Sequence, residues 1–309
     1  MNELNSVKTK EKKAIRKIAY PPFGEIYCRN EMETRLILDE ILVDKLYFQE
    51  GVSISPGDIV LDVGANIGVF ALCAAKQGAH VYAYEPIPAT FKLLQQNIHL
   101  HGLDNMVHPR NIGLSDRSEE KIMFHHPSMS IWDSWNTRED EFELMAENLQ
   151  DVLGVLKTAA PVRYRALKIL GFKSLQQAVV RNAVEKILAS AVRVKCQFDT
   201  LSGAISQDNI QSIALLKLDA ELADWEVLNG VKAQDWQRIR QVAMEVHVES
   251  HVTQLSRFFS ERDFSQVSVK KLNGGTSSLI WATKKTPAVD SADSEELLML
   301  GAAKAGEIC

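Results

Sequence analysis

The sequence predicts an α/β protein built on a doubly wound, mainly parallel sheet. Short apolar runs alternate with amphipathic helical segments along most of the chain, a pattern typical of parallel sheets. The run IVLDV at 59–63 has the length of a buried strand and leads directly into a glycine-rich turn. The last two strand-like segments are joined by Asn273-Gly274-Gly275, a tight turn that makes the final strand antiparallel.

Each predicted element rests on a local pattern. Alternating or continuous apolar residues bounded by Gly or Pro indicate strands, and apolar residues three or four apart indicate helices. The predicted strands are 59–63, 80–85, 107–111, 213–218, 241–246, 266–271 and 278–282. The predicted helices are 33–42, 67–76, 88–101, 222–238 and 252–263.

Residues 130–195 interrupt this alternation with about three predicted helices and no strand pattern, so we expect an inserted helical cap. Its charge is uneven. Residues 133–151 carry seven acidic and one basic side chain, whereas 157–195 carry nine basic and one acidic. We expect the basic half to meet anionic groups, such as an acyl or peptidyl carrier protein, with a solvated helix face as the alternative.

Composition bounds the class of protein. The chain has 309 residues, 46% hydrophobic and 24% charged, which excludes a mainly disordered chain. A net charge of −5 argues against a nucleic-acid partner, and the longest apolar run, Val69–Ala75, is too short to span a membrane. The four cysteines lie far apart without a CxxC pair, so we expect reduced thiols and a cytoplasmic protein.

The two ends differ in charge from each other. Residues 1–20 hold six basic and two acidic side chains, and residues 286–309 hold one basic and five acidic. We expect both to be flexible tails around a single domain that spans 21–285. The sequence makes no prediction of oligomeric state.

The glycine-rich turn carries the main functional signal. Asp62 ends a strand, and Gly64, Asn66 and Gly68 follow it into a helix, so the backbone can approach a ligand closely. Glu85 ends the next strand, where a carboxylate can accept hydrogen bonds from two ribose hydroxyls.

Two nucleotide ligands could use this turn. A dinucleotide fingerprint requires G-x-G-x-x-G, but this chain has G-x-N-x-G, and Asn66 puts a side chain where a diphosphate would pass. S-Adenosylmethionine has no phosphate, and the acidic Asp62 beside the turn suits its cationic groups. We therefore predict S-adenosylmethionine, with a strand–turn–helix that binds no ligand as the alternative.

Three motifs together resemble FkbM-type methyltransferases. They are DVGANIG at 62–68, LLKLDAELADWEVLNG at 215–230 and EVH at 245–247. The resemblance runs from about Asn30 to Trp281. It implies a seven-stranded class I methyltransferase that uses S-adenosylmethionine, releases S-adenosylhomocysteine and commonly makes O-methyl groups in natural products.

The same resemblance extends to details. The segment from Asn30 through Tyr47 to Gly51 resembles the N-terminal helix of members that work with polyketide and peptide synthases. The family usually has Gly and Glu where this chain has Leu222 and Asp224, so no role is carried over to Asp224.

Two strand ends offer groups for methyl transfer. Asp219 and Glu221 end one strand and are two residues apart, as are Glu245 and His247 at the next, so each pair points the same way. We predict His247 as the general base, oriented by Glu221 or Glu245. The alternatives are a hydrogen-bonded strand-end histidine and, for Asp219, a helix N-cap.

These four side chains could also bind Mg²⁺ and orient two substrate oxygens, although nothing in the sequence requires a metal. Five further residues are assigned to the cofactor site. Glu85 has Pro86 beside it, and Asn111, Ser115 and Asp116 follow the third strand, where adenine is expected, with an Asx turn as the alternative. Tyr47 is expected to close over the cofactor, with a core tyrosine as the alternative.

We therefore predict an S-adenosylmethionine-dependent O-methyltransferase acting on a hydroxyl or carboxyl of a small natural-product intermediate. N- or C-methylation uses the same nucleotide site and stays open. A non-catalytic module that keeps the fold is the alternative from a different class. An NAD-dependent dehydrogenase is disfavoured by G-x-N-x-G, and RNA methylation by the absence of an RNA-binding module in the sequence.

Overall fold

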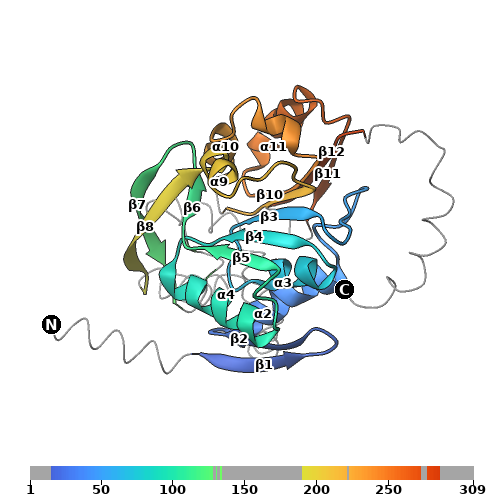
Figure 1. Ribbon diagram of the computed structural model, residues 1–309. Helices are drawn as coiled ribbons and strands as arrows, with labels where there is room; N and C mark the ends of the chain where they lie inside the picture. Colours follow the sequence, from blue (N-terminus) through green and yellow to red (C-terminus); the bar gives the residue numbers. More distant parts are fainter. Residues whose placement is uncertain are drawn as a thin grey trace, which may run out of the picture.

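A seven-stranded sheet forms the centre of the computed structural model, which describes residues 15–127, 130, 133, 190–220, 223–272 and 277–285. Its strands are Ile59–Val63 (β3), His80–Tyr84 (β4), Val107–Arg110 (β5), Leu215–Leu218 (β9), Gln241–Val246 (β10), Gln266–Lys271 (β11) and Ser278–Thr283 (β12). Their order is β11-β12-β10-β9-β3-β4-β5 (Figure 1). Strand β12 is antiparallel to both of its neighbours, and the other pairings are parallel, which confirms the predicted fold class.

Helices cover both faces of this sheet (Figure 1). One face carries Glu31–Leu38 (α2), Val69–Lys76 (α3) and Pro88–Leu100 (α4), and the other carries Leu201–Gln207 (α9), Asp224–Asn229 (α10) and Glu249–Ser260 (α11). A π-helical turn, Asp39–Val43 (η1), continues α2, and a 3₁₀ turn, Asp235–Arg238 (η3), follows α10. Within these described residues no helix is long and apolar enough to cross a bilayer.

The core divides into two hydrophobic clusters, one on each face of the sheet. Alternate strand residues belong to different clusters, because successive side chains of a strand point to opposite faces. Val60 and Leu215 pack with α3 and α4, whereas Leu61 and Leu216 pack with α9, α10 and α11. Side chains two residues further along therefore share a face with these, which places Asp62 and Lys217 on the α3 face.

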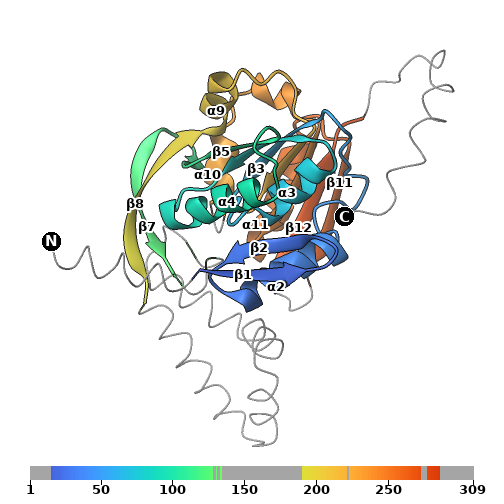
Figure 2. The same cartoon turned by 60° about the horizontal axis from the view of Figure 1, so that its bottom comes forward.

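An N-terminal hairpin lies against the α2–α4 layer and corrects the expected tail. Arg16–Tyr20 (β1) and Gly24–Cys28 (β2) pair antiparallel (Figure 2), so the last part of the predicted flexible segment 1–20 is a strand. Asn97 of α4 fixes the hairpin, since its amide accepts from Tyr27 N at 2.7 Å and donates to Tyr27 O at 3.0 Å. Sequence analysis missed this strand because only Ile18 of β1 is buried. One buried apolar residue among basic ones gives no alternating strand pattern.

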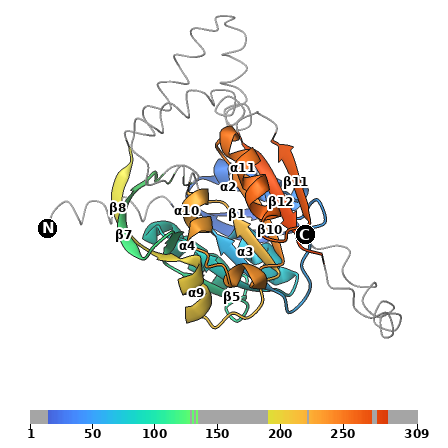
Figure 3. The ribbon, with the colours of Figure 1, turned by 90° about the horizontal axis from the view of Figure 1, so that it is seen from above.

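A second sheet of three strands stands beside the main one (Figure 3). Its strands are Gly113–Ser115 (β6), Glu119–His125 (β7) and Val192–Thr200 (β8), in the order β6-β8-β7, and β7 and β8 are antiparallel. The end of the predicted helical cap 130–195 is therefore strand. Its period-two signal is present, because Cys196 and Phe198 are buried while Lys195 and Gln197 are exposed. The rest of the cap, apart from residues 130, 133 and 190–191, lies outside the described residues.

Candidate functional site

The glycine loop between β3 and α3 is closely fitted to the neighbouring strand. Gly64 and Gly68 have φ of 74° and 95°, a left-handed conformation that favours glycine. A Cβ on Gly64 would lie 1.8 Å from the carbonyl oxygen of Asp219, and one on Gly68 would lie 2.5 Å from Leu94 Cδ1. Both glycines therefore fit closely against their neighbours, and the loop lies at the carboxyl ends of the parallel strands, where ligands bind in open α/β sheets.

Glu85 lies next to this loop at the end of β4. Its Oε2 accepts from Asn66 N at 3.0 Å and its Oε1 accepts from Ile87 N at 2.9 Å. The side chain is buried, and burial raises its pKa to about 8. Two backbone amides thus fix the carboxylate at the position predicted to receive ribose hydroxyls.

The other predicted contacts around Glu85 have mainly local partners. Asn111 donates its amide to the carbonyls of Glu85 and Pro86 at 2.9 and 3.1 Å, and so supports the backbone that carries Glu85. Ser115 is buried in β6, where its hydroxyl accepts from Lys121 Nζ at 2.8 Å and lies 3.3 Å from Asp116 Oδ1. The structure therefore places Ser115 in β6 of the side sheet and Asp116 in the bend that follows it, rather than in a loop directly after β5.

Asp62 is fully buried below the loop, and Lys217 of β9 pairs with it. Lys217 Nζ lies 3.1 Å from Asp62 Oδ1. Sequence analysis assigned Asp62 to the cofactor because its negative charge would attract a cationic ligand. Lys217 neutralises that charge, so this reason is wrong. The missed signal is a lysine in the middle of an apolar strand, IALLKL, because a buried lysine requires a partner.

Three predicted catalytic side chains meet where β9 and β10 end. These strands are parallel neighbours with Leu218 opposite Met244, so Asp219, Glu245 and His247 emerge at the same edge. Each offers one ligand atom, and these atoms lie within 4.8 Å of one another. His247 Nε2 lies 3.7 Å from Glu245 Oε1. Glu221, the fourth predicted member, lies outside the described residues.

Two side chains from the N-terminal part also reach this edge. The hydroxyl of Tyr47 donates to Asp219 Oδ2 at 3.1 Å, so the predicted cofactor residue contacts the catalytic cluster. Burial raises the pKa of Glu40, in the π-helical turn, to about 8, and the charges of Glu245 and Asp219 raise it further. Such π turns often occur at functional sites because they re-aim a side chain, here one that sequence analysis missed.

Asp224, to which no role was carried over, also lies close to this cluster. Its side chain is only 3% exposed, and its Oδ1 accepts no hydrogen bond from the described residues. Burial raises its pKa to about 7, while the charge of His247 lowers it and that of Asp219 raises it. The cluster therefore holds more buried acidic groups than basic ones, which suits a cationic ligand.

Asp224→Asn is expected to flatten the pH dependence of stability. The folded pKa of Asp224 lies above its unfolded value near 3.8, so its penalty is absent at low pH and grows as pH rises toward 7. Thermal unfolding should show the variant more stable than the wild type at pH 8 and equal to it near pH 4. Asp235→Asn is a contrasting control, since Asp235 accepts from Ser202 at 2.6 Å, and equal curves for D224N and wild type would contradict the shift.

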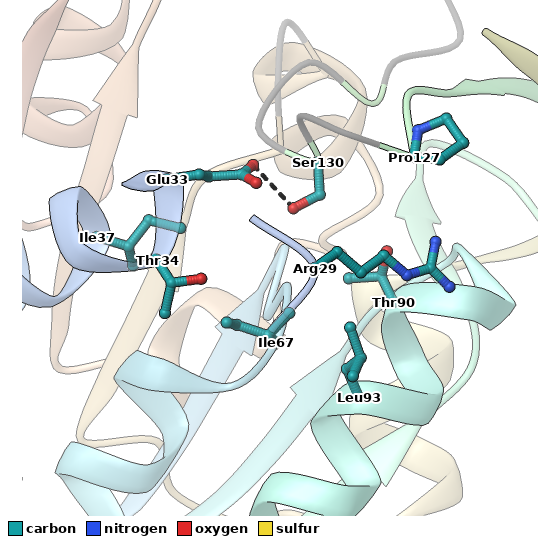
Figure 4. Close-up of a pocket in the computed structure, with 9 residues that line it drawn as sticks. All are labelled: Arg29, Glu33, Thr34, Ile37, Ile67, Thr90, Leu93, Pro127 and Ser130. Atoms are coloured by element: carbon teal, nitrogen blue, oxygen red, sulfur yellow. Dashed lines mark hydrogen bonds between the residues drawn. The ribbon is translucent and has the colours of Figure 1, made fainter. Parts of the chain in front are cut away.

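A pocket borders the glycine loop on the side of α2 and α4 (Figure 4). It is lined by Arg29, Glu33, Thr34, Ile37, Ile67, Thr90, Leu93, Pro127 and Ser130. The Ser130 hydroxyl lies 2.9 Å from Glu33 Oε1 and 3.1 Å from Asn66 Oδ1, so the start of the insertion contacts both α2 and the loop. This contact ties the side chain of Asn66 to the protein.

The two histidines before the insertion are internal. His125 Nδ1 lies 2.7 Å from Asp133 Oδ2, and its Nε2 lies 2.9 Å from Arg29 Nη1. Asp133 Oδ1 accepts from His126 N at 2.6 Å, and both imidazoles are buried. Because a guanidinium only donates, His125 Nε2 is the acceptor there and Nδ1 carries the proton. The pair fixes the base of the insertion.

Comparisons with known proteins agree with this arrangement. A family model described as methyltransferase FkbM domain matches residues 62–267. The 31-O-demethyl-FK506 methyltransferase FkbM of Streptomyces tacrolimicus is 32% identical over 228 residues, covering 71% of this chain and 76% of the relative. The AMB antimetabolite synthetase AmbE of Pseudomonas aeruginosa is 30% identical over 223 residues, covering 71% of this chain but only 10% of that much longer protein.

Among solved structures, an S-adenosylmethionine-dependent O-methyltransferase of Thermotoga maritima aligns with a TM-score of 0.41 at 12% identity, covering 88% of this chain and 78% of the other. The family model covers more than half of the chain and includes the glycine loop, Glu85 and the strand-end cluster. The protein is therefore a member of the FkbM family of S-adenosylmethionine-dependent methyltransferases.

Proposed function

We propose that the protein methylates a hydroxyl oxygen of a small natural-product intermediate. The observation that carries the proposal is the grouping of Asp219, Glu245 and His247 at one sheet edge, beside the glycine loop. A hydroxyl is a weak nucleophile, and a positioned base speeds its reaction by about 10²–10⁴. The relative from Streptomyces tacrolimicus is named for methylation at an oxygen, which supports the same acceptor class.

The residues at this sheet edge have separate roles in cofactor binding and proton transfer. S-Adenosylmethionine supplies a methyl group on a sulfonium, whose transfer is an in-line displacement. Gly64 and Glu85 would hold the cofactor, and we assign the acceptor proton to His247 Nδ1, because Nε2 faces the Glu245 carboxylate and therefore carries the proton of the neutral ring. Glu245 stabilises the imidazolium that results, and Asp219 and Tyr47 bound the site from the β9 side.

The cofactor half of this proposal is tested by calorimetric titration with S-adenosylmethionine, S-adenosylhomocysteine and, as a control, NAD. We expect the first two to bind and NAD not to bind. The acceptor half is tested by incubating candidate polyols with labelled cofactor and locating the methyl group by NMR. A methyl group on nitrogen or carbon would replace the proposal with N- or C-methylation, and cofactor binding without transfer would support a non-catalytic module.

Glu85→Ala is expected to weaken S-adenosylhomocysteine binding about 10- to 100-fold, because it removes hydrogen bonds to two ribose hydroxyls, each worth about 0.5–1.5 kcal/mol. Isothermal titration calorimetry at fixed pH measures this loss. Glu25→Ala is the matched control, since Glu25 is an exposed strand residue paired with Lys17 at 2.8 Å. Unchanged affinity in E85A would remove Glu85 from the ribose site.

A divalent cation is a second candidate at the same edge, favoured by the three ligand atoms within 4.8 Å of one another. Asp219 and Glu245 would supply oxygen ligands and His247 a nitrogen. Turnover measured after chelation, and again after Mg²⁺ is restored, separates this from base catalysis. Loss and recovery of the rate would assign His247 to the metal, whereas an unchanged rate would leave it as the base.

We further propose that the acceptor is bound to a carrier protein. The excess of basic side chains in residues 157–195 supports this, because carrier proteins present anionic groups. Arg163, Arg165 and Lys168 of this segment lie outside the described residues. Their combined reversal to glutamate should lower the rate on a carrier-bound acceptor and leave the rate on the free acceptor unchanged. Equal effects on both acceptors would end this part of the proposal.

A further inference from the structure

Lys217 is a buried charged residue to which the mechanism above assigns no role. It lies in β9, the strand between β3 and β10, and its side chain is 4% exposed. Parallel register sets it directly opposite Asp62, on the face covered by α3. The rings of Tyr47 and Phe70 lie 5.4 and 5.9 Å from its ammonium nitrogen.

The ammonium group contacts both the glycine loop and Asp219. Nζ donates to Gly64 O at 2.9 Å and to Val63 O at 3.3 Å, and both carbonyls belong to the start of the glycine loop. It also lies 3.1 Å from Asp62 Oδ1 and 3.7 Å from Asp219 Oδ2. Lys217 thus joins the loop after β3 to the carboxylate after β9.

These contacts orient Asp219. Its Oδ2 accepts from Tyr47 and faces Lys217, whereas its Oδ1 is buried and accepts no hydrogen bond from the described residues. Burial raises the pKa of Tyr47 well above its ordinary value, so its hydroxyl stays a donor. With Oδ2 accepting from Tyr47 and facing the ammonium group of Lys217, Oδ1 is the oxygen directed to a ligand.

The strand order indicates which part of the cofactor arrives there. Glu85 follows β4 and Asp219 follows β9, on opposite sides of β3 and its glycine loop. A cofactor whose ribose binds at Glu85 and which crosses the loop carries its amino-acid end to Asp219. That end bears an ammonium group, which matches a carboxylate oxygen and the carbonyls of the loop.

We propose that Lys217 is a positioning residue for the amino-acid end of the cofactor, acting through Gly64 and Asp219. A purely structural role, in which Lys217 only neutralises the buried Asp62, is the competing explanation. The proposal rests on the cofactor site and not on the identity of the methyl acceptor.

The double substitution Asp62→Asn with Lys217→Met separates the two explanations. It removes one negative and one positive charge, so the net charge around Asp219 is unchanged. Lys217→Met alone leaves a buried carboxylate without a counter-charge and is expected to lower the unfolding temperature strongly. The double variant should recover most of that temperature, because both buried charges are gone.

Binding is measured by calorimetry with two probes, S-adenosylhomocysteine and 5′-methylthioadenosine. The second keeps the adenosine and the sulfur but lacks the amino-acid end. In the double variant we expect S-adenosylhomocysteine to bind at least ~10-fold more weakly, whereas 5′-methylthioadenosine changes less than ~2-fold. Asp62→Asn with Lys217→Gln, which restores a short donor, should recover part of the loss.

Lys284→Met is the matched control. Lys284 Nζ also donates to a backbone carbonyl, that of Trp236, and lies 4.9 Å from the ring of Phe264, away from the loop. Both probes should bind this variant as they bind the wild type.

If the folded double variant binds S-adenosylhomocysteine with wild-type affinity, the proposal is overturned. Lys217 then serves only as a counter-charge for Asp62. Equal weakening of both probes would overturn it too, because it would indicate general damage to the site. If the methionine variant does not fold, the same comparison in the glutamine variant decides. Failure of either probe to bind the wild type would instead contradict the cofactor assignment itself.

Discussion

Gly64→Ala is expected to abolish measurable cofactor binding. The added Cβ would lie 1.8 Å from the carbonyl oxygen of Asp219, and neither backbone can yield without separating β3 from β9. The loop would have to move away from the strand-end cluster. We expect a loss of S-adenosylhomocysteine affinity of at least ~100-fold in calorimetry, together with a lower unfolding temperature.

Gly57→Ala is the control that separates the effect of the steric clash at Gly64 from the effect of its left-handed backbone conformation. Gly57 has φ of 85°, close to that of Gly64, but an added Cβ there meets no atom within 4 Å. This control carries only the left-handed cost, about 1–2 kcal/mol, and should keep full cofactor affinity. If G64A and G57A bound the cofactor equally well, the close contact between the loop and Asp219 would not be needed for cofactor binding.

His247→Gln is expected to lower the turnover number by about 10²–10⁴, the usual contribution of a general base. Glutamine keeps hydrogen-bonding capacity but cannot take the acceptor proton. Cofactor affinity should stay within about twofold, because the imidazole faces Glu245 rather than the glycine loop. Single-turnover rates with labelled S-adenosylmethionine measure the chemical step directly.

His251→Gln is the control for this substitution. His251 lies in α11, where its ring centroid is 6.2 Å from that of Trp225. This variant should turn over at the wild-type rate. Full activity of H247Q would assign the proton to another group, of which Asp219 and Glu245 are the nearest described candidates.

Much of the main sheet could be predicted because its signals are local. The runs that became β10 and β11 end where the sequence places them, and the Gly-containing turn before β12 predicts its antiparallel direction. The loop and the two strand ends with acidic residues could likewise be located, since strand–turn–helix geometry follows from short-range patterns.

The errors concern contacts between distant segments. Strands β1 and β8 are partly exposed, and their pairing with β2 and β7, rather than their own strand propensity, stabilises them. The pairing of Lys217 with Asp62 depends on which strands are neighbours, and strand order is not visible in one sequence. The same holds for Glu40, whose approach to the strand ends depends on a π-helical turn.

The antiparallel pair β7 and β8 has one more consequence. His125 and Val192 are opposite each other in the ladder, so the end of β7 and the start of β8 lie side by side. Asp133 and its two histidine partners close the base on the outgoing side. Chain length between residues 133 and 190 is thereby uncoupled from the sheet, because the entropy of closing a loop grows only slowly with its length. The β7–β8 pair is therefore a position at which a change in the length of the connecting segment would leave the strand-end cluster in place.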